Sequence, residues 1–419
     1  MTERTPNLPS RLPGVGTTIF SVMSALAAER SAINLGQGFP DFAAPDFVKR
    51  AAADAIAADL NQYAPMPGTP HLRQAVAAQW QREHGRELDW QAEVSVTSGA
   101  TEALCDAALA LLDPGDSAIV FEPAYDSYVP CITMAGATPI PVQLRPPVAA
   151  LAGQGFGEHG AAANSHSPTP NSQAWRFDPA ELRDAFERGP KLIFLNTPHN
   201  PTGKVYSRAE LELVAELCRE YDVLAITDEV YDRLLYDGAE HVPLATLPGM
   251  WERTLTLNSV GKTFSVTGWK IGWAVGPANL VRALRQAHQW VTFATATPFQ
   301  EAAAAALDLS AANGYYAQLR REYAERRELL RSLLAAAGLP TLPVQGSYFI
   351  SADIAALGYA DDRAFCRFLT TEIGVAAIPI SAFYSDPAAA PGFARFCFAK
   401  QAATLQAAGE RLLALKSRA

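Results

Sequence analysis

Short runs of β-branched and aromatic residues alternate with amphipathic stretches through the middle of the chain. Five such runs occupy residues 94–97 (VSVT), 117–122 (SAIVFE), 191–196 (KLIFLN), 223–228 (VLAITD) and 254–260 (TLTLNSV). Continuous apolar runs of this length are typical of strands that are buried on both faces, and helical patterns separate most of them. The alternation predicts an α/β fold with a mostly parallel sheet.

A chain of 419 residues is long for a single core, so two domains are expected. A long helical tract from about Pro277 to Ala337 is followed by a shorter mixture of strands and helices, which indicates a small α+β domain. We predict an N-terminal arm that contributes to the small domain (1–45), a large domain (46–295) and a small C-terminal domain (296–419). Within the large domain, residues 149–174 are rich in Gly, Ala, Ser and Pro, and this composition predicts a mobile surface insertion.

Charge and cysteine usage exclude several classes of function. The net charge of −9 argues against binding to nucleic acid or an anionic membrane, because both need a basic surface. The five cysteines are scattered without a Cys-x-x-Cys pair, and the histidines lack metal-ligand spacing, so we expect a reducing compartment and no metal site. The N-terminus is polar and proline-rich, unlike a signal peptide, and no apolar run is long enough to span a bilayer. The predicted location is cytoplasmic.

Polar residues follow each of the five predicted strands. In an open α/β sheet the carboxyl ends of the strands form the crevice where ligands bind. These ends bring together a glycine-containing helix start, an aromatic ring, amides, a carboxylate with a phenol, and an amine. The segments are 98–101, 122–125, 196–200, 228–231 and 259–262.

The amine at the last strand end, Lys262, has three possible explanations. The sequence VGKT resembles the end of a nucleotide-binding phosphate loop, but that motif requires glycine where the chain has Thr256. The other two explanations are that Lys262 is a nucleophile that binds a carbonyl group, or that it is an ordinary surface charge in water. The gathered residue types favour pyridoxal 5′-phosphate, whose aldehyde needs a lysine and whose ring nitrogen needs a carboxylate. Its phosphate needs a helix N-terminus, and its flat ring needs an aromatic neighbour.

Eight motifs then occur in order: NLGQGFPDF, NQYAPMPGTPHLR, TSGATEAL, EPAYDSY, NTPHNPTGKV, TDEVYD, SVGKTFSVTGWKIGW and RFCFAK. In their order and spacing the chain resembles the fold-type I, class I/II pyridoxal phosphate-dependent aminotransferases throughout, apart from residues 149–174. It is most similar to the branch that contains kynurenine, glutamine and methionine aminotransferases. The resemblance implies a large domain with a mostly parallel seven-stranded sheet, a smaller α+β domain and a homodimer.

The resemblance also implies roles for individual residues. Lys262 would bind the cofactor aldehyde, Asp228 would pair with the ring nitrogen, and Tyr231 would donate to the ring phenolate; these three are the expected catalytic residues. The other expected cofactor contacts are Asn200 at the phenolate, Tyr125 stacked on the ring, Gly99, Ala100, Thr101, Ser259 and Lys270 at the phosphate, and Tyr63 at the phosphate of the neighbouring subunit. Pro198 and Pro201 are candidates for cis peptide bonds.

The expected substrate site lies beside the cofactor. Arg395 would bind the substrate α-carboxylate, with Asn200 and Gly38 at the same end, since a side chain at Gly38 would block that carboxylate. Arg395 is the one arginine expected at the substrate, so the expected reaction is transfer of an amino group from a neutral amino acid to a 2-oxo acid. Methionine, glutamine and aromatic amino acids, including kynurenine, are the expected donors. Candidate walls of the side-chain pocket are Phe20, Tyr63, Tyr125, Phe293 and Phe383.

Two other functions remain open at this stage. A pyridoxal phosphate-dependent carbon–sulfur β-lyase that acts on cysteine S-conjugates shares the fold and most of the residues above. A regulator built on an aminotransferase-like domain would need a basic helix-turn-helix segment, and the first 45 residues show no such pattern.

Overall fold

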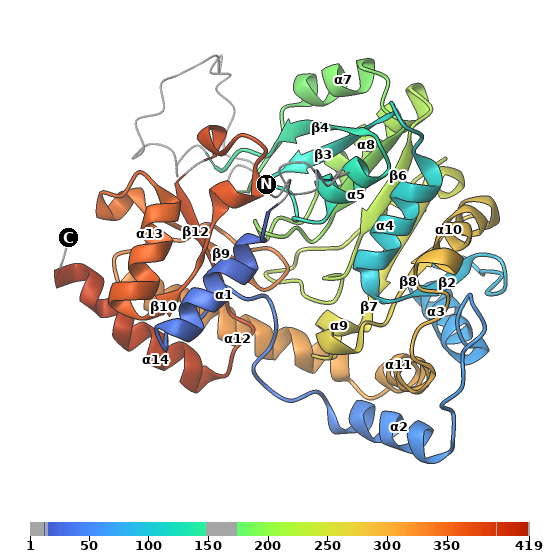
Figure 1. Cartoon of the computed structure of the whole chain (residues 1–419), viewed down its shortest axis with the longest axis horizontal. Helices are drawn as coiled ribbons and strands as arrows, with labels where there is room; N and C mark the ends of the chain where they lie inside the picture. Colours follow the sequence, from blue (N-terminus) through green and yellow to red (C-terminus); the bar gives the residue numbers. More distant parts are fainter. Residues whose placement is uncertain (1–11, 13–15, 148–173, 391, 418–419) are drawn as a thin grey trace, which may run out of the picture.

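The computed structural model of the chain describes residues 12, 16–147, 174–390 and 392–417. Its centre is a seven-stranded sheet with the order β2-β8-β7-β6-β5-β3-β4 (Figure 1). All neighbouring pairs are parallel except those of β8, which is antiparallel to β2 and β7. The predicted α/β fold with a mostly parallel seven-stranded sheet is confirmed. The strands are β2 (Val94–Thr97), β3 (Ser117–Glu122), β4 (Thr138–Gln143), β5 (Leu192–Asn196), β6 (Leu224–Asp228), β7 (Thr254–Ser259) and β8 (Gly272–Val275).

Helices cover both faces of the sheet, because alternate residues of each strand are apolar on opposite sides. On one face Val120 and Ile226 share a core with three helices, and on the other face Ile119 and Ile193 belong to a separate core. The first face carries α4 (Gly99–Leu111), α5 (Tyr128–Met134) and α10 (Ala278–Val291). The second carries α7 (Pro179–Glu187), α8 (Arg208–Glu220), α3 (Pro70–His84) and α11 (Thr297–Ser310), and α2 (Asp46–Ala57) packs on α11.

The last part of the chain forms a smaller lobe around an antiparallel sheet of order β11-β12-β9. A second, two-stranded sheet pairs β1 from the N-terminal arm with β10, and Figure 1 shows α1 (blue) among the orange and red elements of this lobe. This pairing supports the prediction that the arm contributes to the small domain, while the boundaries at residues 45 and 295 stay predictions. The elements are α1 (Ile19–Glu29), β1 (Ile33–Asn34), α12 (Tyr315–Ala336), β9 (Phe349–Asp353), α13 (Asp362–Phe368), β10 (Val375–Ala376), β11 (Ile378–Pro379), β12 (Phe393–Cys397) and α14 (Ala402–Leu412).

Single helical turns connect several of these elements. The one that matters for function is α9 (Val260–Thr263), which follows β7 directly. The predicted strand therefore ends at Ser259, and Lys262 lies on a helical turn rather than at the strand end. The remaining turns are Leu244–Thr246, Trp251–Arg253, Thr267–Trp269, Ala355–Leu357, Leu369–Ile373, Ile380–Phe383, Pro387–Ala389 and Leu413–Ser417.

Two strands of the main sheet were not among the five predicted runs. Strand β4 contains Pro139 and Pro141, which cannot donate to a neighbouring strand, and the sheet accommodates them because β4 lies at its edge. Strand β8 is only four residues long and begins with Gly272, so neither its length nor its composition identified it.

The predicted mobile insertion lies outside the described residues from 149 to 173, and its last residue, Ala174, is buried. Arg145 and Arg176 on either side of it pair through two backbone hydrogen bonds of 2.7 and 2.9 Å. Among the described helices, none has the length and apolar character that a bilayer-spanning segment needs.

Gly272 allows β8 to approach the start of α4. A Cβ atom at this position would lie 2.6 Å from the carbonyl carbon of Gly99 and 2.7 Å from the nitrogen of Ala100, both rigid backbone atoms. Gly272→Ala should therefore displace α4 and lower the free energy of unfolding by roughly 1–3 kcal/mol, measured by urea denaturation. Gly268→Ala is the matched control, because nothing lies within 4 Å of its Cβ position. Equal stability of the two variants would contradict the close approach.

Candidate active site

A cavity of about 210 Å³ lies where the carboxyl ends of the central strands meet the small lobe. The segments that follow the five predicted strands converge on it, as expected from their order in the sheet. Its lining includes all the predicted site residues except Tyr63: Gly38, Gly99, Ala100, Thr101, Tyr125, Asn200, Asp228, Tyr231, Ser259, Lys262, Lys270 and Arg395. The structure thus brings these residues together, and their individual roles stay predictions.

Lys262 presents a buried amine to this cavity. Burial lowers the pKa of Lys262 to about 8, although the charge of Asp228 acts in the opposite direction. Its Nζ atom lies 5.8 Å from the ring centres of both Tyr231 and Tyr348. Within the described part of the chain, no hydrogen bond or ion pair engages this amine. An amine that loses its proton near neutral pH and has no partner is available as a nucleophile and as a base.

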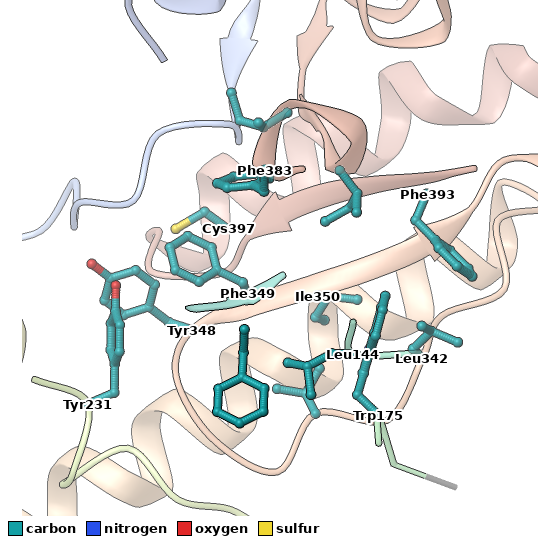
Figure 2. Close-up of a cluster of buried hydrophobic side chains, with 14 of the residues drawn as sticks. Leu144, Trp175, Tyr231, Leu342, Tyr348, Phe349, Ile350, Phe383, Phe393 and Cys397 are labelled. Carbon is teal, nitrogen blue, oxygen red and sulfur yellow. The ribbon is translucent and has the colours of Figure 1, made fainter. Parts of the chain in front are cut away.

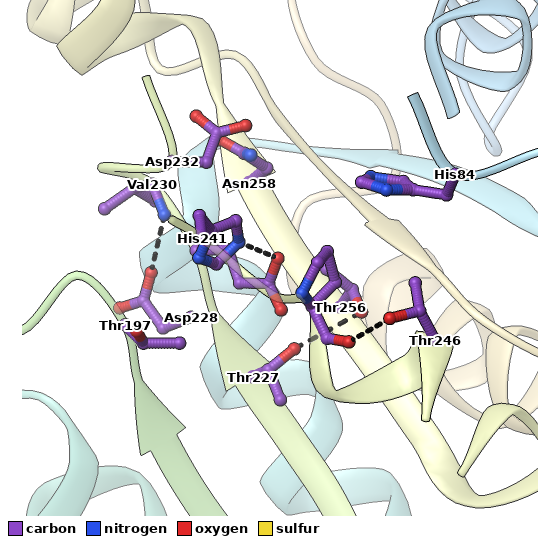
Figure 3. Close-up of polar contacts among 12 residues, drawn as sticks. His84, Thr197, Thr227, Asp228, Val230, Asp232, His241, Thr246, Thr256 and Asn258 are labelled. Atoms are coloured by element: carbon purple, nitrogen blue, oxygen red, sulfur yellow. Dashed lines mark hydrogen bonds and ion pairs between the residues drawn. The ribbon is translucent and has the colours of Figure 1, made fainter. Parts of the chain in front are cut away.

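Asp228 ends strand β6 and is also buried, which raises its pKa to about 6. Two donors favour its ionised form. The Tyr128 hydroxyl donates to Oδ2 at 2.8 Å. The Val230 N–H donates to Oδ1 at 3.4 Å, as Figure 3 shows. The next residue, Glu229, instead bonds His241 at 2.7 Å. Asp228 is therefore a carboxylate that a cationic group in the cavity can keep ionised.

Two residues that position the site had no role assigned to them from the sequence. Tyr128 lies in EPAYDSY, three residues after Tyr125, but nothing in the motif showed which phenol reaches Asp228. Asn196 ends β5; its Nδ2 donates to the backbone oxygen of Asp228 at 2.8 Å, and its Oδ1 accepts from the Asn200 N–H at 2.7 Å. These bonds fix the Asn200 loop against the neighbouring strand end.

The peptide bonds before Pro198 and Pro201 are cis, as predicted, and the bond before Pro123 is cis as well.

At the other end of the cavity, the N-terminus of α4 meets Lys270. Gly99 has φ +77°, and a Cβ there would lie 3.2 Å from Nζ of Lys270, so the ammonium group lies directly against the helix start. Unpaired backbone N–H groups at a helix N-terminus carry partial positive charge. Together with the Ser259 hydroxyl and the Lys270 ammonium, this end of the cavity suits a phosphate dianion.

Arg395 on β12 is fully buried at the small-lobe side of the cavity. Its NH1 donates to Oδ1 of Asn200 at 2.9 Å and its NH2 donates to the Gly36 oxygen at 2.6 Å, whereas Nε has no partner among the described residues. Burial lowers the pKa of Arg395 to about 10, and the ring centre of Phe349 lies 3.9 Å from the guanidinium carbon. A buried cation without a bonded carboxylate suits an anionic group of a ligand.

An aromatic cluster separates this cavity from the core of the small lobe. Tyr231 packs edge-on against Tyr348 with ring centres 5.1 Å apart, next to Phe349 (Figure 2). A Cβ atom on Gly38 would lie 2.8 Å from the Phe349 ring, and the Tyr348 hydroxyl donates to the Gly38 oxygen. The Phe349 ring is thus a second reason for glycine at this position, and the predicted effect of a side chain on the substrate carboxylate stays a prediction.

The five predicted wall residues do not all reach the cavity. Phe20 and Tyr125 line it, and Phe383 packs against Phe20 with ring centres 5.7 Å apart. Tyr63 and Phe293 lie outside the cavity, and their ring centres are 5.8 Å apart. The prediction that they form walls of the side-chain pocket is therefore wrong for the cavity of their own subunit. Sequence reasoning missed several lining residues, because no motif separates them from core positions: Gln37, Phe39, Leu104, Val230, Thr267, Ile271 and Phe349.

The family model for aminotransferase class I and II matches residues 30–412. The chain belongs to the class I and II aminotransferases. It is 43% identical to the probable N-succinyldiaminopimelate aminotransferase DapC of Mycobacterium tuberculosis, over 98% of each chain. It is 41% identical to the human kynurenine–oxoglutarate transaminase 1, over 96% of each chain. The crystal structure of YbdL from Escherichia coli, described as having a methionine aminotransferase function, superposes with a TM-score of 0.87 at 38% identity and covers 98% of this chain and 100% of that one.

The family and fold of this aminotransferase are pyridoxal phosphate-dependent, which confirms the predicted cofactor. The relatives carry transaminase names, so the β-lyase alternative is not favoured. Proteins of this fold family are typically dimeric.

Burial of Lys262 should make the stability of the cofactor-free protein depend on pH. Its pKa is about 8 in the folded protein against an ordinary value of 10.5, so between these pH values the unfolded chain binds more protons. Lys262 alone should therefore add roughly 3 kcal/mol to the free energy of unfolding as the pH rises across this window. Burial raises the pKa of Cys218, Cys366 and Tyr323, and these groups act in the opposite direction, so the informative quantity is the difference between the wild type and Lys262→Met. Urea denaturation at pH 7.5, 9 and 10.5 should show that this difference rises with pH. The exposed Lys191, changed to Met, should keep the wild-type profile; identical profiles in all three proteins would contradict the assignment.

Proposed function

We propose that this aminotransferase transfers the amino group of a neutral amino acid to a 2-oxo acid. The donors are methionine, glutamine and aromatic amino acids, including kynurenine. The observation that carries the proposal is the set of cations in the cavity: among its lining residues these are Lys262, Lys270 and Arg395. Two of them suit the cofactor and one suits an α-carboxylate, so a carboxylate at the far end of a donor finds no further cation among the described residues that line the cavity.

The lining residues fit the cofactor at each of its polar groups. Lys262 would bind the aldehyde carbon and Asp228 the ring nitrogen, while Tyr231 and Asn200 would donate to the phenolic oxygen. Tyr125 would stack on the ring. The backbone of Gly99, Ala100 and Thr101, with Ser259 and Lys270, would hold the phosphate. When bound, pyridoxal phosphate supplies an electron-withdrawing ring that acidifies the hydrogen on the α-carbon of the amino acid.

Lys262 then acts as the base. Its Nζ has a pKa of about 8, so about a tenth of the amine is unprotonated at pH 7, against far less for an ordinary lysine, and can accept the proton from the substrate α-carbon. Because the amine is buried and has no hydrogen-bond partner among the described residues, it is free to move between the atoms that lose and gain the proton.

Arg395 orients the amino acid. A bidentate contact between its guanidinium and the α-carboxylate would fix the α-carbon relative to Lys262. The Phe349 ring 3.9 Å away shields the guanidinium from water, which strengthens that contact. Gly38, whose oxygen already accepts from Tyr348, lies at the same end of the cavity.

We also propose a cytoplasmic homodimer in which Tyr63 reaches the phosphate of the neighbouring subunit. Tyr63 is 87% exposed and packs edge-on against the exposed Phe293, and Trp290, three residues before Phe293 in the sequence, is 84% exposed. Such a group of exposed apolar residues is typical of an interface between subunits. The five cysteines are unpaired in the structure, which agrees with a reducing compartment.

A panel of amino donors against several 2-oxo acids tests the reaction. Methionine, glutamine, phenylalanine and kynurenine should be converted to their 2-oxo acids, with aspartate and N-succinyldiaminopimelate slower by at least ten-fold. Lys262→Ala should lower turnover by roughly 10³-fold or more and should abolish the visible absorbance of a lysine-bound cofactor. Normal turnover by Lys262→Ala would refute the role of the lysine, and release of ammonia and pyruvate from cysteine conjugates without 2-oxo acid formation would favour the lyase.

Arg395→Lys tests the carboxylate contact separately. Lysine keeps the positive charge but loses the bidentate geometry, so kcat/KM should fall by roughly 10- to 100-fold for every donor. The wild type and the variant should bind the cofactor equally well, because Arg395 is assigned to the substrate. A decrease for only one class of donor would instead place Arg395 at the side-chain end of the pocket.

A further inference from the structure

His288 on α10 is a completely buried imidazole at the junction of three segments. Its Nδ1 lies 2.9 Å from Oε1 of Glu102 on α4, and its Nε2 lies 3.1 Å from the backbone oxygen of Met66. A carbonyl oxygen only accepts hydrogen bonds, so Nε2 carries a proton and donates to Met66. Nδ1 faces the carboxyl group of Glu102 within hydrogen-bonding distance.

Glu102 connects this ring to the predicted phosphate site. Its other oxygen, Oε2, accepts a hydrogen bond from the backbone N–H of Ser98, the residue directly before α4. Bonds to His288 and Ser98 help to hold the pKa of Glu102 below its ordinary value, against the effect of burial. An ionised Glu102 therefore fixes the chain just before Gly99, Ala100 and Thr101, whose N–H groups are assigned to the phosphate.

Met66 connects the same ring to the loop that carries Tyr63. The loop is also held where the Thr297 hydroxyl donates to the Gln62 oxygen at 2.5 Å. Beyond α10, the His288 oxygen accepts from the Phe293 N–H at 2.9 Å, and the Phe293 ring packs edge-on against Tyr63. His288 thus contacts this loop through its side chain and supports the aromatic partner of Tyr63 through its backbone.

We propose that His288 is a positioning residue that fixes two parts of the active sites at once. Through Glu102 it holds the start of α4 for the phosphate in its own subunit, and through Met66 it holds the loop that presents Tyr63 to the neighbouring subunit. The proposal rests on the proposed cofactor site and dimer. It predicts that different substitutions of His288 can remove one hydrogen bond at a time, and that the loss of each bond causes a different defect.

The chemistry of asparagine and glutamine allows this separation. The Asn amide nitrogen lies the same number of bonds from Cα as Nδ1 of histidine, and the Gln amide nitrogen the same number as Nε2. His288→Asn therefore keeps the bond to Glu102 and loses the bond to Met66. His288→Gln keeps the bond to Met66 and loses the bond to Glu102.

The phosphate arm is tested by titrating the cofactor-free dimer with pyridoxal phosphate and with pyridoxal, which lacks the phosphate. The wild type should bind pyridoxal phosphate far more tightly. In His288→Gln the dissociation constant of pyridoxal divided by that of pyridoxal phosphate should fall by about ten-fold, because the hydrogen bond to the charged Glu102 is lost. His288→Asn should keep the wild-type ratio. Glu102→Gln should lower this ratio as His288→Gln does, and it tests the phosphate arm if His288→Gln does not fold.

The loop arm is tested by sedimentation of the cofactor-loaded enzymes. His288→Asn should raise the dissociation constant of the dimer by about ten-fold, whereas His288→Gln should leave it unchanged. Asp106→Asn is the matched control for both arms: this buried carboxylate lies 3.7 Å from Nδ1 but has no hydrogen-bond partner among the described residues. Asp106→Asn should change neither the ratio of the cofactor dissociation constants nor the dissociation constant of the dimer.

Three results would overturn the proposal. The first is an unchanged ratio in both His288→Gln and Glu102→Gln, and the second is the same combination of defects in His288→Asn and His288→Gln, which indicates general packing. The third is a stoichiometric metal ion in the purified protein, because potential ligand atoms of Glu102, Asp106 and His288 lie within 4.8 Å of one another. If the wild type itself does not prefer pyridoxal phosphate to pyridoxal, the phosphate site of the proposed function fails instead.

Discussion

Burial has opposite effects on the two charged groups at the centre of this protein. It lowers the pKa of the Lys262 amine to about 8 and raises the pKa of the Asp228 carboxyl to about 6. Each charge partly offsets the cost of burying the other, and donors from Tyr128 and Val230 add to the stabilisation of the carboxylate. Both groups therefore titrate close to neutral pH, where a base and a partner for a cationic ring are needed. The sheet, its helices and the small lobe shield the Lys262 amine and the Asp228 carboxyl group from water.

Arg395 explains why the site needs both lobes. It extends from a strand of the small lobe, bonds Asn200 of the large domain, and bonds the Gly36 oxygen of the N-terminal arm. A single buried guanidinium thus joins three segments that are far apart in the sequence. A substrate carboxylate that binds this group contacts the junction of the lobes, so substrate recognition and the relative position of the lobes depend on the same side chain.

Strands that are apolar on both faces were predicted well, because a continuous apolar run needs no information from elsewhere in the chain. The proline-containing β4 and the four-residue β8 were missed, since their place in the sheet depends on the neighbours they pair with. The same division holds at the site. Lys262 and Asp228 stood out by their chemistry close after the predicted strands, whereas Tyr128, Asn196 and Glu102 act through contacts that only the folded chain creates.

By itself the sequence determined the α/β class, the family and the residue types that meet at one edge of the sheet. These follow from local periodicity and from the order of motifs along the chain. Only the tertiary structure decided that Tyr63 and Phe293 lie outside the cavity of their own subunit, that the Phe349 ring lies against Gly38, and that His288 joins Met66 to Glu102. Burial and hydrogen bonding between distant segments set these features, and neither is encoded in the spacing of residues along the chain.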